Sequence, residues 1–250
     1  MANTLVHNFF DPKFVTLEII PNYFKMSGAS ALIKSSLAKK YWMALTGLFL
    51  CFFLIVHLAG NLTLLAGDSA RAGFNAYTKF MTSFVPIKVA SYITYLGILF
   101  HAVDGLLLTL KNRKARPVKY AYEKPQVNSI WSSRNMGVLG TAIFVFIVLH
   151  MGNFWFRYKF TTLPTDVDGN FDMYGVVVES FKMEWYVGLY VLCMAALAFH
   201  LYHGFWSAFQ TLGVNHPKYT PAIKKLGFGF SILIPLGFAI IPIAVYVMNL

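Results

Sequence analysis

The stretch YWMALTGLFLCFFLIVHLAGNLTLLA, residues 41–66, decides the fold class of this 250-residue chain. It contains no Lys, Arg, Asp or Glu, and its one imidazole belongs to His57. An α-helix needs about 20 predominantly apolar residues to cross roughly 30 Å of hydrocarbon. This stretch is therefore long enough and apolar enough to span a membrane.

Four more stretches share this character, at residues 89–110, 135–156, 185–212 and 226–250. Among all five, only Asp104 carries a formal charge. Over the whole chain 57% of the residues are hydrophobic and 12% are charged, whereas soluble domains carry about a quarter charged residues. The sequence thus predicts an all-α, membrane-spanning bundle of five transmembrane helices. It excludes a water-soluble enzyme and a secreted scaffold held by disulfides.

The basic residues predict the orientation of the bundle. Of the 21 Lys and Arg residues, 15 fall in residues 1–40 and in the second and fourth connections, which lie on one side. Cytoplasmic loops carry such an excess, so we expect the N-terminus in the cytoplasm and the C-terminus outside. The net charge of +11 therefore does not indicate a nucleic-acid partner. Residues 1–40 are expected to form a polar cytoplasmic segment and residues 41–250 one transmembrane domain.

Between the first two spans, large apolar side chains recur at helical spacing: Phe74, Tyr77, Phe80, Met81 and Phe84. A helix with one apolar face can lie in the plane of a membrane interface. We therefore expect a short amphipathic helix at the outer interface, with an ordinary capping loop as the alternative.

The histidines point to function. Five of the seven lie inside the predicted spans: His57, His101, His150, His200 and His203. An ionisable residue inside a membrane is costly and is a functional candidate by default, although a single histidine equally suits a hydrogen bond between helices. Here each of the first four spans contributes at least one histidine, and the fifth contributes none.

The histidines of the first four spans fall at two depths, counted at about 1.5 Å of rise per residue. His57 and His150 lie roughly 5–7 Å to the outer side of the bilayer centre, and two others lie roughly 2 Å to the inner side. We therefore expect an outer pair, His57 with His150, and an inner pair, His101 with His200. Depth favours His200 over His203, which is left as a contact behind the ligands or as the alternative ligand.

Two facing imidazoles suit haem iron. A bare zinc or copper ion wants three or four protein ligands, whereas a porphyrin leaves the protein only the axial positions. Gly60, Gly105 and Gly204, each close to one of the histidines, are expected to leave room for the porphyrin, although small residues also serve helix packing. Cys51 and Cys193 stand far apart without a C-x-x-C motif, so any iron–sulfur cluster is expected in another chain.

Cations at the cytoplasmic ends of the spans are candidates for holding the propionates of the inner haem. Lys39 and Arg134 are the residues we assign to this contact. Asp104, one turn beyond His101, is expected either to take part in proton transfer or to reach the interface with its side chain. His7 and His216 lie in polar segments and are interpreted as surface residues.

Five segments resemble one protein family. They are SSLAKKYWMALTG (35–47), HLAGNL (57–62), FNAY (74–77), KNRKARP (111–117) and HGFWSAFQTLG (203–213). All are similar to segments of the membrane-anchor cytochrome b subunits of bacterial succinate:quinone oxidoreductases. The likeness covers nearly the whole chain from residue 35 on, in the single-chain, five-helix, two-haem form shared with some fumarate reductases.

The resemblance implies a function. A flavoprotein subunit with FAD would interconvert succinate and fumarate, and an iron–sulfur subunit would relay the electrons. This chain would be the non-flavin anchor that exchanges them with quinone, menaquinone rather than ubiquinone, through two b haems. The resemblance also implies the inner (cytoplasmic) membrane of a bacterium and allows a higher oligomer of the complex. The H-x-x-x-G spacing at His101 and His200 matches the family's ligand pattern and supports His200 over His203.

The quinone contact is left open. The candidates are Asp68 and Lys79 on the outer side and Tyr41, Trp42, Trp131 and His216 on the cytoplasmic side. The alternative functions are a cytochrome b subunit of a hydrogenase, formate dehydrogenase or fumarate reductase, and a haem-free anchor or transporter. The segments SSLAKK and HGFWS argue against a hydrogenase or formate dehydrogenase, and the chain has no inverted repeat of the kind that transporters show.

Overall fold

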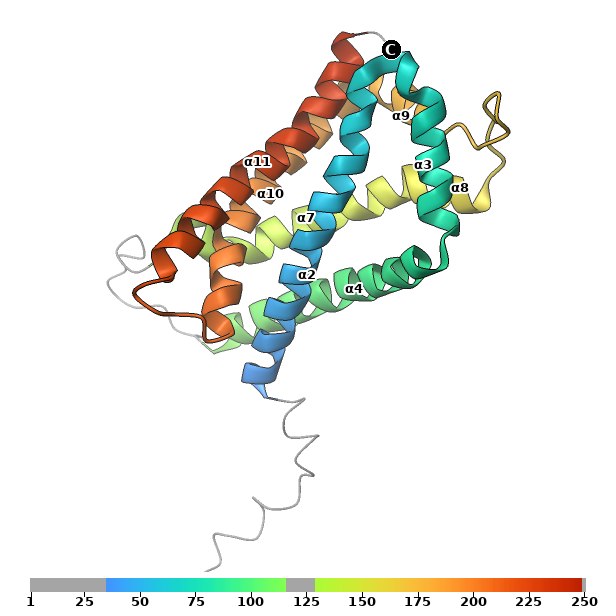
Figure 1. Cartoon of the computed structure of the whole chain (residues 1–250). Coiled ribbons are helices and arrows are strands. Elements are labelled where there is room, and N and C mark those ends of the chain that lie inside the picture. The colour runs from blue at the N-terminus through green and yellow to red at the C-terminus, as the bar shows by residue number, and fades with distance from the viewer. Residues whose placement is uncertain (1–34, 116–128, 249–250) are drawn as a thin grey trace, which may run out of the picture. The chain divides into compact units, whose positions relative to one another are not determined.

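The structure, a computed structural model, describes residues 35–115 and 129–248, and all regular elements within them are helices (Figure 1). The long helices are α2 (Ser36–Leu62), α4 (Val85–Lys114), α7 (Met136–Met151), α10 (Glu184–Thr211) and α11 (Thr220–Val247). The helix of α7 continues through η2 (Gly152–Phe156) and α8 (Arg157–Phe160). Five helices are thus long and apolar enough to cross a membrane. The predicted five-span all-α bundle is confirmed, and the chain is a multi-pass membrane protein.

The first span ends earlier than residue 66, the end that hydropathy predicts. After Leu62 the chain turns through the short helix η1 (Thr63–Ala70), in which Gly67 has φ 68° and ψ −154°. Residues with a Cβ rarely adopt this backbone conformation, which glycine takes at little cost. Gly67 therefore lets the apolar run stop spanning and fold back. The predicted polar segment, residues 1–40, lies outside the described residues apart from 35–40, while Lys39–Leu250 form one compact unit.

The amphipathic helix predicted after the first span is present as α3 (Arg71–Ser83). It buries Phe74 and Asn75, leaves most of its other side chains exposed and packs on α4 and α9. Two further helices, α6 (Trp131–Arg134) and α9 (Met173–Phe181), were not expected. In α9 three consecutive valines favour a strand locally, but the Asp172 side chain caps the helix by accepting a hydrogen bond from the Gly175 amide.

The densest packing lies at the end of the bundle where α9 meets α10 and α11. Tyr174, Val177 and Phe181 of α9 pack there with Tyr190 of α10 and Val245 of α11. In the membrane-spanning stretch of α10, 33% of the residues are buried, against 6% in the α7 stretch and 11% in the α4 stretch. One end and one wall of the bundle are therefore well packed, while α4 and α7 present most of their surface outward.

Asn75 ties α3 to the segment before α9. It is 1% exposed, and its amide nitrogen donates to the carboxylates of Asp166 and Asp172, each at 3.0 Å. Its oxygen accepts from the Tyr174 amide at 2.9 Å. Arg71, four residues earlier, pairs with Asp172, its Nε lying 3.1 Å from Oδ1. We call Arg71, Asn75, Asp166 and Asp172 the cap cluster.

Replacing Asn75 by Ala should destabilise the protein by about 1–3 kcal/mol, because the Tyr174 amide and the Asp172 carboxylate lose a buried partner. The melting temperature of the detergent-purified protein, followed by circular dichroism, measures the loss. Asn112→Ala, at an exposed position near the end of α4, is the matched control and should change the stability by less than about 0.5 kcal/mol. Equal melting temperatures for Asn75→Ala and the wild type would contradict this role of Asn75.

The cap cluster also predicts an acid sensitivity. Burial alone would raise the pKa of Asp172, but the hydrogen bonds from Arg71, Asn75 and the Gly175 amide outweigh it and hold the pKa below its usual value. A carboxyl with a depressed pKa stabilises the fold above its unfolded pKa, about 3.9, and this contribution is lost as the pH falls through the folded pKa. The melting temperature should therefore decrease below about pH 4, and Asp172→Asn should flatten that decrease. An unchanged slope in the variant would count against it.

Candidate functional site

The structure brings together the histidines of the outer pair. His57 on α2 and His150 on α7 have ring centroids 5.8 Å apart and ring planes at 88°. Phe53 stacks on the His57 ring at 5.2 Å. The other aromatic rings around the pair are Phe238 beside His57 and Phe146, Phe154 and Tyr190 beside His150. The pair thus lies in an aromatic setting contributed by α2, α7, η2, α10 and α11.

The histidines of the inner pair also meet. His101 on α4 and His200 on α10 have ring centroids 6.1 Å apart and planes at 66°. Glycines border both rings: a Cβ on Gly47 would lie 3.2 Å from Cε1 of His101, and one on Gly140 would lie 3.9 Å from Cε1 of His200. A larger side chain at position 47 would therefore push against the imidazole of His101.

The helices that carry each pair do not pack closely against one another. Among the described residues, α10 packs along α11 and α7, and α4 packs along α7, but neither α2 with α7 nor α4 with α10 is a closely packed helix pair. The imidazoles of each pair therefore meet between helices whose backbones lie apart.

The spacing of the rings fits two ligands of one metal ion. An imidazole nitrogen binds a metal at about 2 Å, so two rings on opposite sides of one ion have centroids about 6 Å apart. The observed separations of 5.8 and 6.1 Å agree with this value. Within the described residues no three His, Cys, Asp or Glu side chains gather where an ion could sit. A donor set of two imidazoles suits haem iron, for which the porphyrin supplies the remaining ligands.

The Thr46 hydroxyl is the hydrogen-bond partner of His101. Its oxygen lies 3.1 Å from Nδ1 of His101, 2.7 Å from the Trp42 carbonyl and 3.3 Å from the Met43 carbonyl. A hydroxyl has one proton, so when Thr46 donates to a carbonyl its oxygen accepts from Nδ1 of His101, which then carries the ring proton. Nε2 of His101 is then the nitrogen left free to bind a metal.

Each pair combines one firmly hydrogen-bonded imidazole with one that lacks a strong partner. Nδ1 of His150 lies 2.9 Å from the Tyr190 hydroxyl. Nδ1 of His57 lies 3.4 Å from the amide nitrogen of Asn61, which bonds the His57 carbonyl at 2.8 Å. Nδ1 of His200 is buried and has no hydrogen-bond partner among the described residues. Thr46 and Tyr190 were not singled out from the sequence, where the available signal was a hydroxyl inside a span.

The other histidines separate as the depths predict. His200, not His203, faces His101, and His203 is half-buried further along α10. His216 is exposed and accepts a hydrogen bond from the Lys218 amide at 3.2 Å, while His7 lies outside the described residues. The space actually left differs among Gly60, Gly105 and Gly204, the glycines expected to make room for a porphyrin.

A Cβ on Gly204 would meet nothing within 4 Å, and one on Gly105 would meet only Cε of Met43 at 3.5 Å. Gly60 is different, because its Cβ would lie 2.7 Å from the ring of Tyr77. The expectation that Gly60 makes room for a porphyrin is wrong: Tyr77 of α3 occupies that space.

Lys39 and Arg134 were predicted to hold haem propionates, and Asp104 to take part in proton transfer or to reach the interface. Lys39 is half-buried near the start of α2, and Asp104 is half-buried on α4. The Arg134 side chain donates to the carbonyl of Ser129. Their assigned roles therefore stay predictions.

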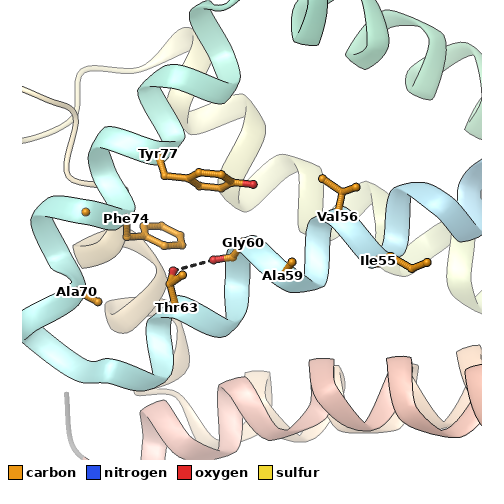
Figure 2. A pocket seen from close by; sticks show the side chains of 9 residues that line it. Ile55, Val56, Ala59, Gly60, Thr63, Ala70, Phe74 and Tyr77 are labelled. Carbon is orange, nitrogen blue, oxygen red and sulfur yellow. Dashed lines mark hydrogen bonds between the residues drawn. The ribbon is translucent and has the colours of Figure 1, made fainter.

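A cavity of about 590 Å³ lies between the end of α2 and α3 (Figure 2). It is lined by Ile55, Val56, Ala59, Gly60, Thr63, Ala70, Gly73, Phe74 and Tyr77. Figure 2 shows Phe74 and Tyr77 of α3 over Ala59 and Gly60 of α2. The Thr63 hydroxyl is engaged with the Gly60 carbonyl at 2.7 Å. The cavity is therefore almost wholly apolar, with the Tyr77 hydroxyl as its available polar group.

The quinone candidates named from the sequence lie elsewhere. Asp68 and Lys79 are exposed and do not line the cavity. Tyr41, Trp42 and Trp131 are exposed. Tyr41 and Trp42 lie near the start of α2, and Trp131 is the first residue of α6. Aromatic side chains at such positions commonly anchor a membrane protein at the interface. The sequence did not indicate the cavity, because it depends on the turn at Gly67 that folds α3 back onto α2.

A comparison with protein families, curated proteins and solved structures gives no match to this chain. The likeness to the anchor subunits of succinate:quinone oxidoreductases therefore rests on the segments quoted above, and the functional assignment rests on the site.

Proposed function

We propose that this chain is the membrane anchor and electron conduit of a succinate:quinone oxidoreductase, and that it holds two b haems. The observation that carries the proposal is the presence of two facing imidazole pairs on the first four spans, with centroids 5.8 and 6.1 Å apart. His57 and His150 would ligate the outer haem, and His101 and His200 the inner one.

Held by these imidazoles, a haem would supply one-electron transfer. The chain's own residues supply orientation and shelter. Thr46, whose oxygen lies 3.1 Å from Nδ1 of His101, would accept a hydrogen bond from Nδ1–H and leave Nε2 to bind the iron. The aromatic rings of Phe53, Phe146 and Phe238 keep water from the outer pair. Two such pairs at different depths suit transfer of electrons across the bilayer.

The proposal places the dicarboxylate chemistry in partner subunits, a flavoprotein with FAD and an iron–sulfur protein. Their docking surface would be the basic end of the bundle. That end includes the cations Lys111, Arg113, Lys114, Lys218, Lys224 and Lys225. By the excess of positive charge this end would face the cytoplasm of a bacterial cell, with α3 and α9 at the outer face.

The proposal assigns the quinone to the cavity between α2 and α3. An isoprenoid tail is apolar and matches the lining of the cavity, and the Tyr77 hydroxyl could donate to a quinone oxygen. Val56 of the lining precedes His57 in the chain, so the cavity and the outer pair meet the same turn of α2 from different sides. The exposed residues Asp68 and Lys79 do not line the cavity.

Replacing any one of His57, His101, His150 or His200 by Ala should remove one haem and impair quinone-linked turnover, because each haem loses an axial ligand. The haem content per chain, measured by absorbance of the reduced protein, should fall to about half. His203→Ala is the matched control and should keep both haems. If His203→Ala loses the inner haem while His200→Ala keeps it, the ligand assignment fails. A wild-type protein without b-type absorbance, or one purified without a flavin-bearing subunit, would overturn the proposed function.

Replacing Gly73 by Leu should fill the cavity and weaken quinone binding. A Cβ on Gly73 meets nothing within 4 Å, so the larger side chain enters open space rather than displacing the helix. The KM for a short-chain quinone should rise about tenfold, a common cost for a pocket that has lost room. Both haems should remain.

Gly188→Leu provides the control for this cavity test. Gly188 on α10 also has open space around its Cβ, but it does not line the cavity. The KM of Gly188→Leu for the quinone should match that of the wild type. Both variants should also reduce a water-soluble electron acceptor at the wild-type rate. Equal KM values for Gly73→Leu and the wild type would place the quinone elsewhere.

A further inference from the structure

A chain of buried polar groups leads away from His150. The Tyr190 hydroxyl, 2.9 Å from Nδ1 of His150, lies 3.2 Å from the Tyr186 hydroxyl. The Asn153 amide donates to Tyr186 at 3.1 Å and to the Ser180 hydroxyl at 2.8 Å. Tyr190, Tyr186 and Ser180 are 7%, 6% and 4% exposed. Buried hydroxyls are retained in a core only with partners, and this chain supplies them.

Two donors of the chain are fixed at its far end. The Ser180 hydroxyl donates to the Val176 carbonyl at 2.7 Å, so it accepts from Asn153. Asn153 also donates to Tyr186. Between Tyr186 and Tyr190 either hydroxyl can be the donor. When His150 binds a metal through Nε2, its Nδ1 carries the proton and the Tyr190 oxygen accepts that hydrogen bond, so Tyr190 donates to Tyr186.

The backbone after His150 is shaped for this contact. Asn153 lies in η2, a π-helical turn that follows directly on α7, and η2 packs on α9. Single π-helical turns inside α-helices are rare and are frequent at functional sites. Here the turn delivers the Asn153 amide to Ser180 of α9 and Tyr186 of α10.

We propose that Tyr190 is a positioning residue that sets the redox potential of the outer haem by accepting a hydrogen bond from Nδ1–H of His150, with Tyr186 and Asn153 holding Tyr190 in place. The inference rests on the proposed function. A hydrogen-bond acceptor on Nδ1–H makes the imidazole a stronger donor to the metal. A stronger donor stabilises the oxidised iron, so Tyr190 lowers the potential of the haem at His150.

The test is a redox titration of haem absorbance in the purified complex, comparing the wild type with Tyr190→Phe and Thr46→Val. Tyr190→Phe should keep both haems and raise the midpoint potential of the outer haem only, by about the 59 mV that corresponds to tenfold in the equilibrium constant of a one-electron couple. Thr46→Val removes the acceptor on His101 and should raise the potential of the inner haem only. His57→Ala, which retains the inner haem alone, assigns the two components.

The outcomes separate the inference from the function. Two bound haems with unchanged potentials in Tyr190→Phe would overturn the inference and leave the proposed function standing, whereas a wild type without haem would overturn the function itself. If Tyr190→Phe loses a haem, Tyr186→Phe decides, because it keeps the contact of Tyr190 with His150. It should raise the potential of the outer haem by less than tenfold in the equilibrium constant, and no shift would overturn the inference.

Discussion

Imidazole nitrogens within the membrane-spanning helices need partners, and this constraint organises the bundle. A neutral imidazole carries one donor and one acceptor nitrogen. Hydrocarbon provides no hydrogen-bond partner for either nitrogen. Thr46 and Tyr190 serve Nδ1 of His101 and His150. The ring centroid of His101 lies 6.1 Å from that of His200, and the ring centroid of His150 lies 5.8 Å from that of His57. Neither α2 with α7 nor α4 with α10 is a closely packed helix pair among the described residues, so the imidazoles meet between helices that lie apart.

The two pairs differ in how firmly the protein holds them. The outer pair adjoins the packed block of α9, α10 and α11, where Tyr190 is part of the buried core and Phe238 lies against His57. The cap cluster fastens α3 to the same block through Asn75. The inner pair lies between α4 and α10, where Nδ1 of His200 lacks a partner among the described residues. The outer pair is therefore the one whose geometry the surrounding packing fixes more firmly.

The sequence predicted the spans and the pairing because both follow from quantities that vary along one helix. Hydropathy marks the spans, and the rise per residue sets the depth of His57 against His150. It did not predict α9, since its three valines favour a strand and only the cap at Asp172 and burial against α10 and α11 make it a helix. Nor did it predict Tyr190 or the space that Tyr77 takes at Gly60, because each depends on contacts between segments far apart in the chain.

Two adjacent faces at the end of α2 contact different features, the outer imidazole pair and the cavity under α3. Phe53, His57 and Asn61 recur every fourth residue and face the imidazole pair, while Val56, Gly60 and Thr63 line the cavity under α3. Side chains three and four apart share a helix face, so the two sets form stripes about 100° apart. The cavity and the outer pair are then separated by no more than one helix, about 10 Å across. The turn at Gly67 creates this arrangement, since folding α3 back onto α2 forms the cavity, which stays open at its exposed lining residues Ile55, Val56 and Tyr77.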